Sequence, residues 1–288
     1  MRVVKPHAEI LPELRPLEKI ELCGRVCYKS EDKIEEGSAR PFAERILSRG
    51  HTSVFEHTRV IMPLDKYRDL RDMGGIQTNP ATDRLEFYYS PYGAAVDIEL
   101  NGRDFVNHVS RNLDLLESLP TAEDYMTVRF ICSRAISQQM QRHRVFSFSE
   151  LSLRYVKYDG DVDFIQPAPY DWADYHDMDG LGDAAADPRW QAWYFACEHA
   201  EEAYHTMLKE GCSPQEARNV LPLCTKSDLV VTARYKEWQE FLKLRLPPGA
   251  DPQMRYLLRQ LVELENFPKE EIGHLEDDEF ICSGALHG

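Results

Sequence analysis

One short stretch of the chain, residues 139–155, concentrates side chains that can bind an anion. It contains Arg142, Arg144 and Arg154, together with a histidine, a glutamate, two glutamines and three serines. Guanidinium groups so close together repel one another unless an anion lies between them, and their planar forks match phosphate oxygens. The fold must therefore gather these cations around a common ligand, which we predict is phosphorylated. The alternative is a solvated helix end, where cations complement the negative end of the helix dipole.

The longer pattern around these arginines resembles the signature of the flavin-dependent thymidylate synthases. That signature is Arg-His-Arg, seven residues and a serine, and it is matched by Arg142, His143, Arg144 and Ser152. Two later segments resemble further motifs of the family in the same order, residues 217–222 with Arg218 and residues 241–245 with Arg245. An earlier segment, residues 50–57, is similar to one that lies near the flavin.

The resemblance implies an enzyme that methylates dUMP to dTMP. In the family, 5,10-methylenetetrahydrofolate donates the carbon, and FAD reduced by NADPH supplies the hydride. The resemblance implies dUMP contacts from Gln139, Arg142, Glu150, Leu151, Ser152, Arg154, Arg218 and Arg245. It implies FAD contacts from His51, Ser53, Arg142, His143, Arg144, Glu150, Arg234, Lys236 and Glu240.

The chemistry of the pyrimidine ring suggests what two of these residues do. The C5 carbon is a poor nucleophile, so methylation needs either attack at C6 or electrostatic support for an ionised ring. The resemblance places the Arg245 cation against the ring and favours the second route. A nucleophilic Ser152 is the alternative, but the sequence shows no base with an orienting group beside it. We therefore expect Arg245 and Ser152 to bind and activate the substrate without a covalent intermediate.

Several positions depart from the family pattern. Ser149 stands where the family commonly has asparagine, and Arg234, Lys236 and Glu240 replace a more usual set of flavin contacts. These departures support a second hypothesis, a catalytically silent protein of the same fold that binds or senses nucleotides. Flavin content separates the two hypotheses.

Composition limits the partners of the chain. The net charge of −15 over 288 residues opposes binding to polynucleotides, although a locally basic pocket can still hold one nucleotide. Seven scattered cysteines without a Cys-x-x-Cys pair indicate neither a disulfide framework nor a zinc ribbon. We expect no metal at His51 and His57, no calcium in the acidic residues 171–187, and no metal-dependent hydrolase. No signal sequence or membrane span is seen, so we predict a cytoplasmic protein.

The pattern of elements predicts an α+β fold, with a mixed or antiparallel sheet packed against long helices. No Gly-x-Gly-x-x-Gly follows a strand, so the fold is expected to be non-Rossmann. The resemblance implies a homotetramer whose active sites lie between subunits. We predict one domain over residues 1–288, with an inserted helix-hairpin-helix segment at about 64–124 that carries no catalytic residue, and an acidic tail at about 269–288.

Hydrophobic periodicity places the elements along the chain. It predicts strands at 2–11, 58–62, 84–89, 94–100 and 227–233, with an extended segment at 163–169. It predicts helices at 16–28, 39–47, 64–73, 103–119, 188–211, around 238–245 and at 252–265, with a short one opened by a capping box at Ser213. A long helix at 122–143, begun by Thr121 and Asp124, is expected to present Gln139, Arg142 and His143 from one helix end.

Overall fold

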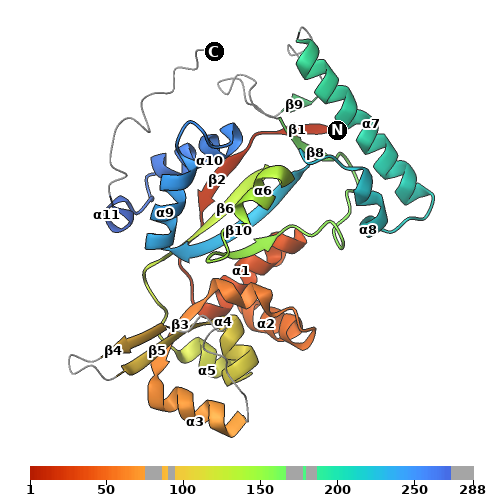
Figure 1. Cartoon of the computed structure of the whole chain (residues 1–288). Coiled ribbons are helices and arrows are strands. Elements are labelled where there is room, and N and C mark those ends of the chain that lie inside the picture. Colours follow the sequence, from red (N-terminus) through yellow and green to blue (C-terminus); the bar gives the residue numbers. More distant parts are fainter. Residues whose placement is uncertain (75–85, 90–94, 167–177, 180–186, 274–288) are drawn as a thin grey trace.

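The computed structural model describes residues 1–74, 86–89, 95–166, 178–179 and 187–273. A four-stranded sheet forms the centre of the larger lobe, and a three-stranded sheet lies in a second lobe beneath it (Figure 1). The predicted α+β class is confirmed. No helix among the described residues is both long enough and apolar enough to span a bilayer.

The central sheet is antiparallel, and both of its faces are covered. Its strands lie in the order β2 (His7–Ile10), β6 (Tyr125–Ser133), β10 (Lys226–Arg234) and β7 (Ser147–Glu150). On one face, α9 (Tyr235–Arg245) and α10 (Pro252–Glu263) pack against alternate strand residues through Trp238 and Leu257. On the other face, α1 (Pro16–Tyr28) contacts β7 and β10.

The helix predicted over 122–143 is wrong. Residues 125–133 form β6, and only Arg134–Met140 are helical, as α6. Eight of the nine β6 residues are buried because helices cover both faces of the sheet. A strand buried on both sides carries apolar residues at consecutive positions, so its pattern also satisfies a helical period. The Thr121–Asp124 cap therefore starts no helix.

Pro6 divides the strand predicted at 2–11. Proline cannot donate a backbone hydrogen bond, so pairing stops there and the chain changes sheets. β1 (Arg2–Val4) joins a small sheet between β8 (Asp163–Ile165), which is parallel to it, and β9 (Met178–Asp179), which is antiparallel. Most of the acidic segment 171–187, for which we expect no calcium site, lies outside the described residues, namely 171–177 and 180–186.

The second lobe contains the predicted hairpin. β4 (Glu86–Tyr89) pairs antiparallel with β5 (Ala95–Asn101), as predicted, and β5 also pairs with β3 (Arg59–Pro63). Its short helical elements are α3 (Leu64–Gly74), α4 (Gly102–Asp104), the π-helical turn η3 (Phe105–Val109) and α5 (Leu113–Ser118). The single helix predicted at 103–119 is therefore interrupted, because Asn112 caps a new helix at Leu113.

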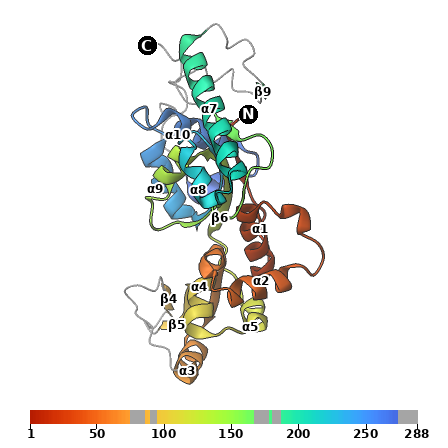
Figure 2. The ribbon, with the colours of Figure 1, turned by 90° about the vertical axis from the view of Figure 1, so that its right-hand side faces the viewer.

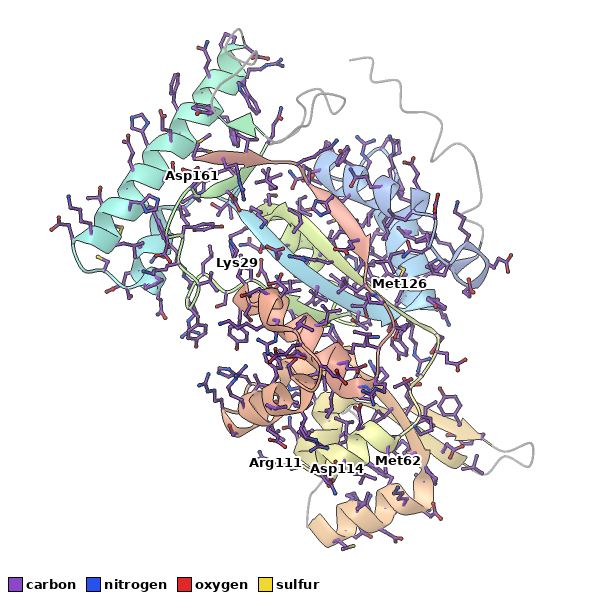
Figure 3. The ribbon with its side chains drawn as sticks, turned by 180° about the vertical axis from the view of Figure 1, so that it is seen from behind. Lys29, Met62, Arg111, Asp114, Met126 and Asp161 are labelled. Carbon is purple, nitrogen blue, oxygen red and sulfur yellow. The ribbon has the colours of Figure 1, made fainter. Side chains whose placement is uncertain are left out.

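The second lobe shares its core with the N-terminal helices. Ile98 and Phe105 belong to the same buried cluster as Ile20 of α1 and Phe42 of α2 (Ala39–Ser48). Figure 2 shows α1 and α2 beside this lobe, and Figure 3 shows Met62 there and Met126 at the near end of the central sheet. The segment predicted as an insertion is thus packed into the fold along one of its faces.

The remaining helices begin where capping chemistry predicts. Asp187 caps α7 (Pro188–Lys209), Asp251 caps α10, and Ser213 with Glu216 forms the predicted capping box of α8 (Pro214–Ala217). The short helical turns are η1 (Glu31–Lys33), η2 (Thr52–His57), η6 (Arg218–Val220) and α11 (Lys269–Ile272). The predicted acidic tail therefore starts with a helical turn, and residues 274–288 lie outside the described part.

His57 is fully buried beneath the central sheet. Its Nδ1 lies 2.8 Å from Oγ1 of Thr232, which in turn lies 2.8 Å from Oγ1 of Thr127. Burial lowers the pKa of His57 from 6.5 to about 3, and the cation of Lys19 acts in the same direction. A neutral imidazole in a threonine network stabilises the core, so this histidine is structural in the chain as described.

The pH dependence of unfolding should report this burial. His57 takes up a proton in the unfolded chain near pH 6.5 and in the folded chain only near pH 3. Its contribution to stability is complete above pH 6.5 and falls toward pH 3, by up to about 1.4 kcal/mol per pH unit. We expect His57→Gln to flatten this slope in denaturant titrations, and exposed His199→Gln to leave it unchanged. Parallel slopes for wild type and His57→Gln would contradict the assignment.

Candidate functional site

The Arg142-His143-Arg144 motif lies in a tight turn that links α6 to β7. Ser133 caps α6 by accepting a hydrogen bond from the Ile136 amide, and the helix ends at Met140. Phe146 then anchors the turn, because its ring packs 4.9 Å from that of Trp238, centroid to centroid. The predicted presentation from a helix end is wrong for Arg142 and His143, which a turn presents instead.

Glu150 holds this turn against the sheet. Its Oε1 accepts hydrogen bonds from Ser137 of α6 at 2.6 Å and from Ser227 of β10 at 2.7 Å. Its Oε2 accepts one from Gln141 at 3.0 Å, and Arg134 lies 3.5 Å away. Both carboxylate oxygens are therefore engaged within the chain. The expected contacts of Glu150 with dUMP and FAD stay predictions, and the structure adds a positioning role.

Arg245 and His143 meet at the end of α9. The Arg245 Nε and Nη2 atoms lie 3.2 and 3.1 Å from Nε2 of His143, which accepts from the guanidinium. The His143 ring also packs edge-on against Phe241 at 4.6 Å. Burial, followed by the nearby Arg245 cation, lowers the pKa of His143. The imidazole is thus neutral, with its remaining proton on Nδ1. The structure therefore brings together Arg245, which is predicted to contact the pyrimidine, and His143, which is predicted to contact the flavin.

A second group of cations lies where β7 leaves the sheet. Arg154 donates from Nε to the side chain of Gln215 at 3.1 Å, and its guanidinium lies 5.4 Å from the Tyr155 ring centroid. Gln215 belongs to α8, and Arg218 opens η6 directly after that helix. Ser152 is fixed through its amide, which donates to the carbonyl of Cys27 at 3.3 Å.

The apolar neighbours of Ser152 tie these elements together. Leu151 and Leu153 are buried in one cluster with Ala217 of α8 and Tyr204 of α7. Ser152, between these two buried leucines, is itself only partly buried and is held in place by them. The leucine predicted to contact dUMP, Leu151, is itself 1% exposed.

Two arginines of these groups have no partner for their guanidinium among the described residues. Within the described residues, the side chains of Arg142 and Arg218 make no hydrogen bond or ion pair in the chain, and Arg142 is exposed. Gln139 differs, because its amide donates to Asp251 at 3.1 Å. Guanidiniums without a partner in the chain can bind phosphate oxygens with charge-assisted hydrogen bonds.

His51 and Ser53 occupy the start of η2, which packs against α1 and β7. Gly50 precedes them with φ of +72°, a left-handed conformation that ends α2 and favours glycine. Nδ1 of His51 lies 3.1 Å from the Tyr28 hydroxyl, and Ser53 is exposed. Both residues therefore lie on the element that neighbours the strand carrying Glu150.

The Arg234 side chain lies between the two lobes, where it binds acidic partners. Its Nη2 donates to Glu99 of β5 at 2.6 Å, its Nη1 pairs with Asp124, and its guanidinium lies 4.8 Å from the Tyr125 ring centroid. Glu99 is fully buried and also accepts hydrogen bonds from Tyr88 and Tyr125. The FAD contact of Arg234 stays a prediction, and the structure gives this residue a docking role.

Lys236 and Glu240 lie exposed along α9, and Glu240 is 3.4 Å from Lys243. The described contacts do not join these two residues to the Arg142 turn. Their FAD contacts stay predictions.

Sequence reasoning missed the partners that fix the site. They are Ser137, Gln141 and Ser227 around Glu150, and Asp228 with its cations. Burial would raise the pKa of Asp228, but Lys226 and Arg129 together hold it below its ordinary value. Asp228 in turn accepts the Leu151 amide through its carbonyl at 2.8 Å. Most of these partners are far apart in sequence, so no local pattern signals them.

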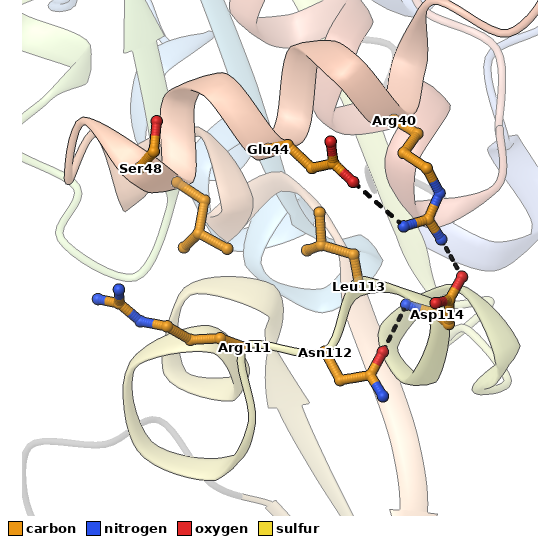
Figure 4. A pocket seen from close by; sticks show the side chains of 8 residues that line it. Arg40, Glu44, Ser48, Arg111, Asn112, Leu113 and Asp114 are labelled. Carbon is orange, nitrogen blue, oxygen red and sulfur yellow. Dashed lines mark hydrogen bonds and ion pairs between the residues drawn. The ribbon is translucent and has the colours of Figure 1, made fainter.

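A separate open pocket of about 380 Å³ lies between α2 and residues 111–114 (Figure 4). Arg40 pairs there with Glu44 and Asp114, while Arg111 lines the opposite wall. Acidic and basic side chains balance in this pocket, so it offers no clear preference for an anion.

The sequence model of the family described as "Thymidylate synthase complementing protein" matches residues 103–268. The chain belongs to this family. The match includes the Arg142 turn, Arg218 and Arg245, and it begins at Arg103, inside the segment predicted as an insertion. The identification of the family from its motifs is thus confirmed.

Two curated relatives of the chain carry the same name. A flavin-dependent thymidylate synthase of Mycobacteroides abscessus is 33% identical over 140 residues, covering 46% of this chain and 55% of the relative. Another, of Mycolicibacterium gilvum, is 31% identical over 176 residues, covering 54% and 64%. The chain thus spans less than two thirds of the length of these relatives. A solved UMP/dUMP methylase, PolB from Streptomyces cacaoi bound with 5-Br dUMP, is 19% identical, with 90% of each chain covered and a TM-score of 0.41.

Removing the Arg234 charge tests its docking role. Arg234→Met should leave the buried Glu99 carboxylate without its main cation, which we expect to lower the free energy of unfolding by about 3 kcal/mol. Combining Arg234→Met with Glu99→Gln should restore most of that loss, measured by denaturant unfolding of the protein without added ligands. Lys236→Met, on the exposed neighbour, serves as control. Unchanged stability of Arg234→Met would show that Glu99 does not depend on Arg234.

Removing Arg245 should change the titration of His143. Because this cation and burial both lower the pKa of His143, Arg245→Gln should raise that pKa. An NMR titration of the imidazole resonances measures the shift, with Lys243→Gln as a control for loss of one exposed charge on the same helix. An unchanged His143 titration in Arg245→Gln would rule out the contact.

Proposed function

We propose that the chain converts dUMP to dTMP, with 5,10-methylenetetrahydrofolate as carbon donor and FAD reduced by NADPH as hydride source. The observation that carries the proposal is the family match over residues 103–268, which includes all three arginine motifs. The names of the relatives, flavin-dependent thymidylate synthases, support the same activity.

We assign dUMP to the surface shared by the motif turn, Ser152 and α8. Arg154 and Arg218 lie on neighbouring segments, and Arg142 and Arg218 carry open charges, which suits a phosphate monoester. Gln139 of α6, Glu150 at the end of β7 and Leu151 directly after it are next to the motif turn or Ser152 in the chain. The backbone hydrogen bond from Ser152 to Cys27 keeps the serine at a fixed position for the substrate.

Arg245 activates the pyrimidine in this proposal. Its guanidinium is held in orientation by neutral His143, so the positive charge is not cancelled by a carboxylate among the described residues. A fixed cation beside the ring stabilises negative charge that develops on it, which makes C5 more nucleophilic. The described contacts place no histidine or carboxylate at the Ser152 hydroxyl, which supports binding rather than nucleophilic catalysis by this serine.

The residues around the motif fit a flavin nucleotide. Arg144 is exposed beside Arg142, and both can face the pyrophosphate of FAD. His51 and Ser53 lie on η2, next to β7, and can donate to polar groups of the cofactor. When bound, the reduced flavin supplies the hydride that completes the methyl group. The chain's own residues bind the two ligands and orient them.

We propose that a homotetramer completes the site. Val145 and Tyr155 flank the cationic residues and are 52% and 60% exposed in the single chain. Apolar side chains beside a ligand site are suited to contact a neighbouring subunit. A subunit docked there would also exclude water from the bound nucleotide.

One observation favours the second candidate, a silent nucleotide-binding protein. The engagement of Arg234 by Glu99 and Asp124 occupies a residue expected at the flavin. A chain that had given up flavin would keep the cations for dUMP while this end of β10 took on a structural role.

The absorption spectrum of the purified protein separates the candidates. We expect bound FAD whose visible bands shift when dUMP is added, because both ligands contact the same turn. Arg218→Gln should weaken dUMP binding about tenfold or more while retaining FAD, since a charge-assisted hydrogen bond contributes about 1.5–3 kcal/mol. Arg111→Gln, an arginine outside the site, is the control. Binding of dUMP without any retention of added FAD would establish the silent candidate.

A further inference from the structure

Two cysteines far apart in sequence face each other beneath the α7 helix. Sγ of Cys197, in the middle of α7, lies 3.5 Å from Sγ of Cys224, which lies between η6 and β10. Cys197 is 1% exposed, whereas Cys224 is partly exposed. In the central core, Cys23 and Cys27 are both buried, unlike the partly exposed Cys224, and burial raises the pKa of each to about 12. Those thiols are inert at neutral pH.

A pocket borders Cys224. The pocket has a volume of about 270 Å³, and Cys224 lines it together with Ala135, Ile136, Asp251 and Gln253. Cys197 is absent from its lining and lies in the apolar cluster behind Cys224. Of the two cysteines, Cys224 is therefore the one that lies at the pocket, and Cys197 lies behind it in the apolar cluster.

The backbone around Cys224 is held firmly. The Ile165 amide donates to the Cys224 carbonyl at 2.8 Å, and the Ala135 amide donates to the Leu223 carbonyl at 3.1 Å. Closing a disulfide requires the sulfurs to approach from 3.5 Å to about 2.05 Å. Side-chain rotation and a small shift of α7, which packs on this segment through apolar contacts, can supply that movement.

The pKa values of the two thiols shift in opposite directions. The hydrogen bond between them lowers the pKa of Cys224 and raises that of Cys197, which burial raises further. Cys224 is also the more exposed thiol of the two, so it is the one expected to attack a disulfide first.

We propose that Cys224 and Cys197 form a thiol–disulfide exchange site for low-molecular-weight disulfides. The Cys224 thiolate attacks one sulfur of the small disulfide, which forms a mixed disulfide and releases one small thiolate. That thiolate takes the Cys197 proton, and the Cys197 sulfur then attacks the Cys224 sulfur and releases the second small molecule as a thiolate, protonated by solvent. Two protein thiols are oxidised to one disulfide, and the small disulfide is reduced to two thiols.

Closing this disulfide would restrain the segment that carries Arg218. A Cys197–Cys224 bond ties α7 to the segment just after η6, where Arg218 lies. The site itself rests only on the two sulfurs and the pocket. It stands whether or not the chain methylates dUMP, and its test measures thiols alone.

The test treats the full chain with glutathione disulfide, followed by acid quenching, alkylation and peptide mass mapping. A Cys282→Ser background removes the cysteine that lies outside the described residues. We expect one cross-linked peptide pair, Cys197 with Cys224, that reverts on treatment with dithiothreitol. Oxidation should be several-fold faster than glutathionylation of Cys212, the partly exposed cysteine beyond the end of α7.

Variants assign the order of the two steps. Cys197→Ser should stop at a stable mixed disulfide on Cys224, Cys224→Ser should leave Cys197 unmodified, and Cys212→Ser should cross-link like the parent. A persistent glutathione adduct on Cys224 in the parent protein would overturn the proposal, as would modification of Cys212 ahead of Cys224. Mapping of the parent protein decides the matter even if a variant fails to fold.

Discussion

The pairing of β6 with β10 is the constraint on which the site depends. Nine residues of each strand pair in antiparallel register, from Lys226 with Ser133 to Arg234 with Tyr125, and helices cover both faces. A nine-residue strand spans about 30 Å, so its two ends are far apart. The α6 helix leaves β6 at one end and leads into the motif turn, whereas α9 leaves β10 at the other end. Its eleven residues, about 16 Å of helix, carry Arg245 back to His143. The contact between two distant motifs is thus set by one pair of strands.

The sequence was enough to place most helices, because their caps depend on nearby residues. It was not enough to predict which segments are buried by distant parts of the chain. The capping residues Asp187, Ser213 and Asp251 mark their helices because a cap needs only neighbours within one turn. Residues 125–133 were misread because burial on both faces removes the alternation that identifies a strand. The family motifs indicated where cations gather, but not what orients them. Glu150 depends on Ser227, 77 positions away, and no sequence period records such a contact.

Two sets of arginines in the fold contrast in their partners. Arg25 pairs with Glu21, and Arg129 pairs with Asp228, each within a core or beside the central sheet. A buried guanidinium without a carboxylate would be strongly destabilising, so these pairs are conditions of folding. Arg142 and Arg218 have no such partner in the described chain and lie at the surface. The net charge of −15 makes this contrast informative, since carboxylates are plentiful and the open cations still lack them.

The departure at Arg234 and the segment predicted as an insertion are physically linked. Glu99 comes from that segment and is fully buried, so it requires a cation and hydrogen-bond donors at its carboxylate. Arg234 supplies the cation, and Tyr88 and Tyr125 supply the hydroxyl donors. A neutral side chain at position 234 would leave Arg59, whose Nη1 lies 3.9 Å from Oε1 of Glu99, to balance this carboxylate. The buried Glu99 therefore ties the residue at position 234 to the docking of the second lobe.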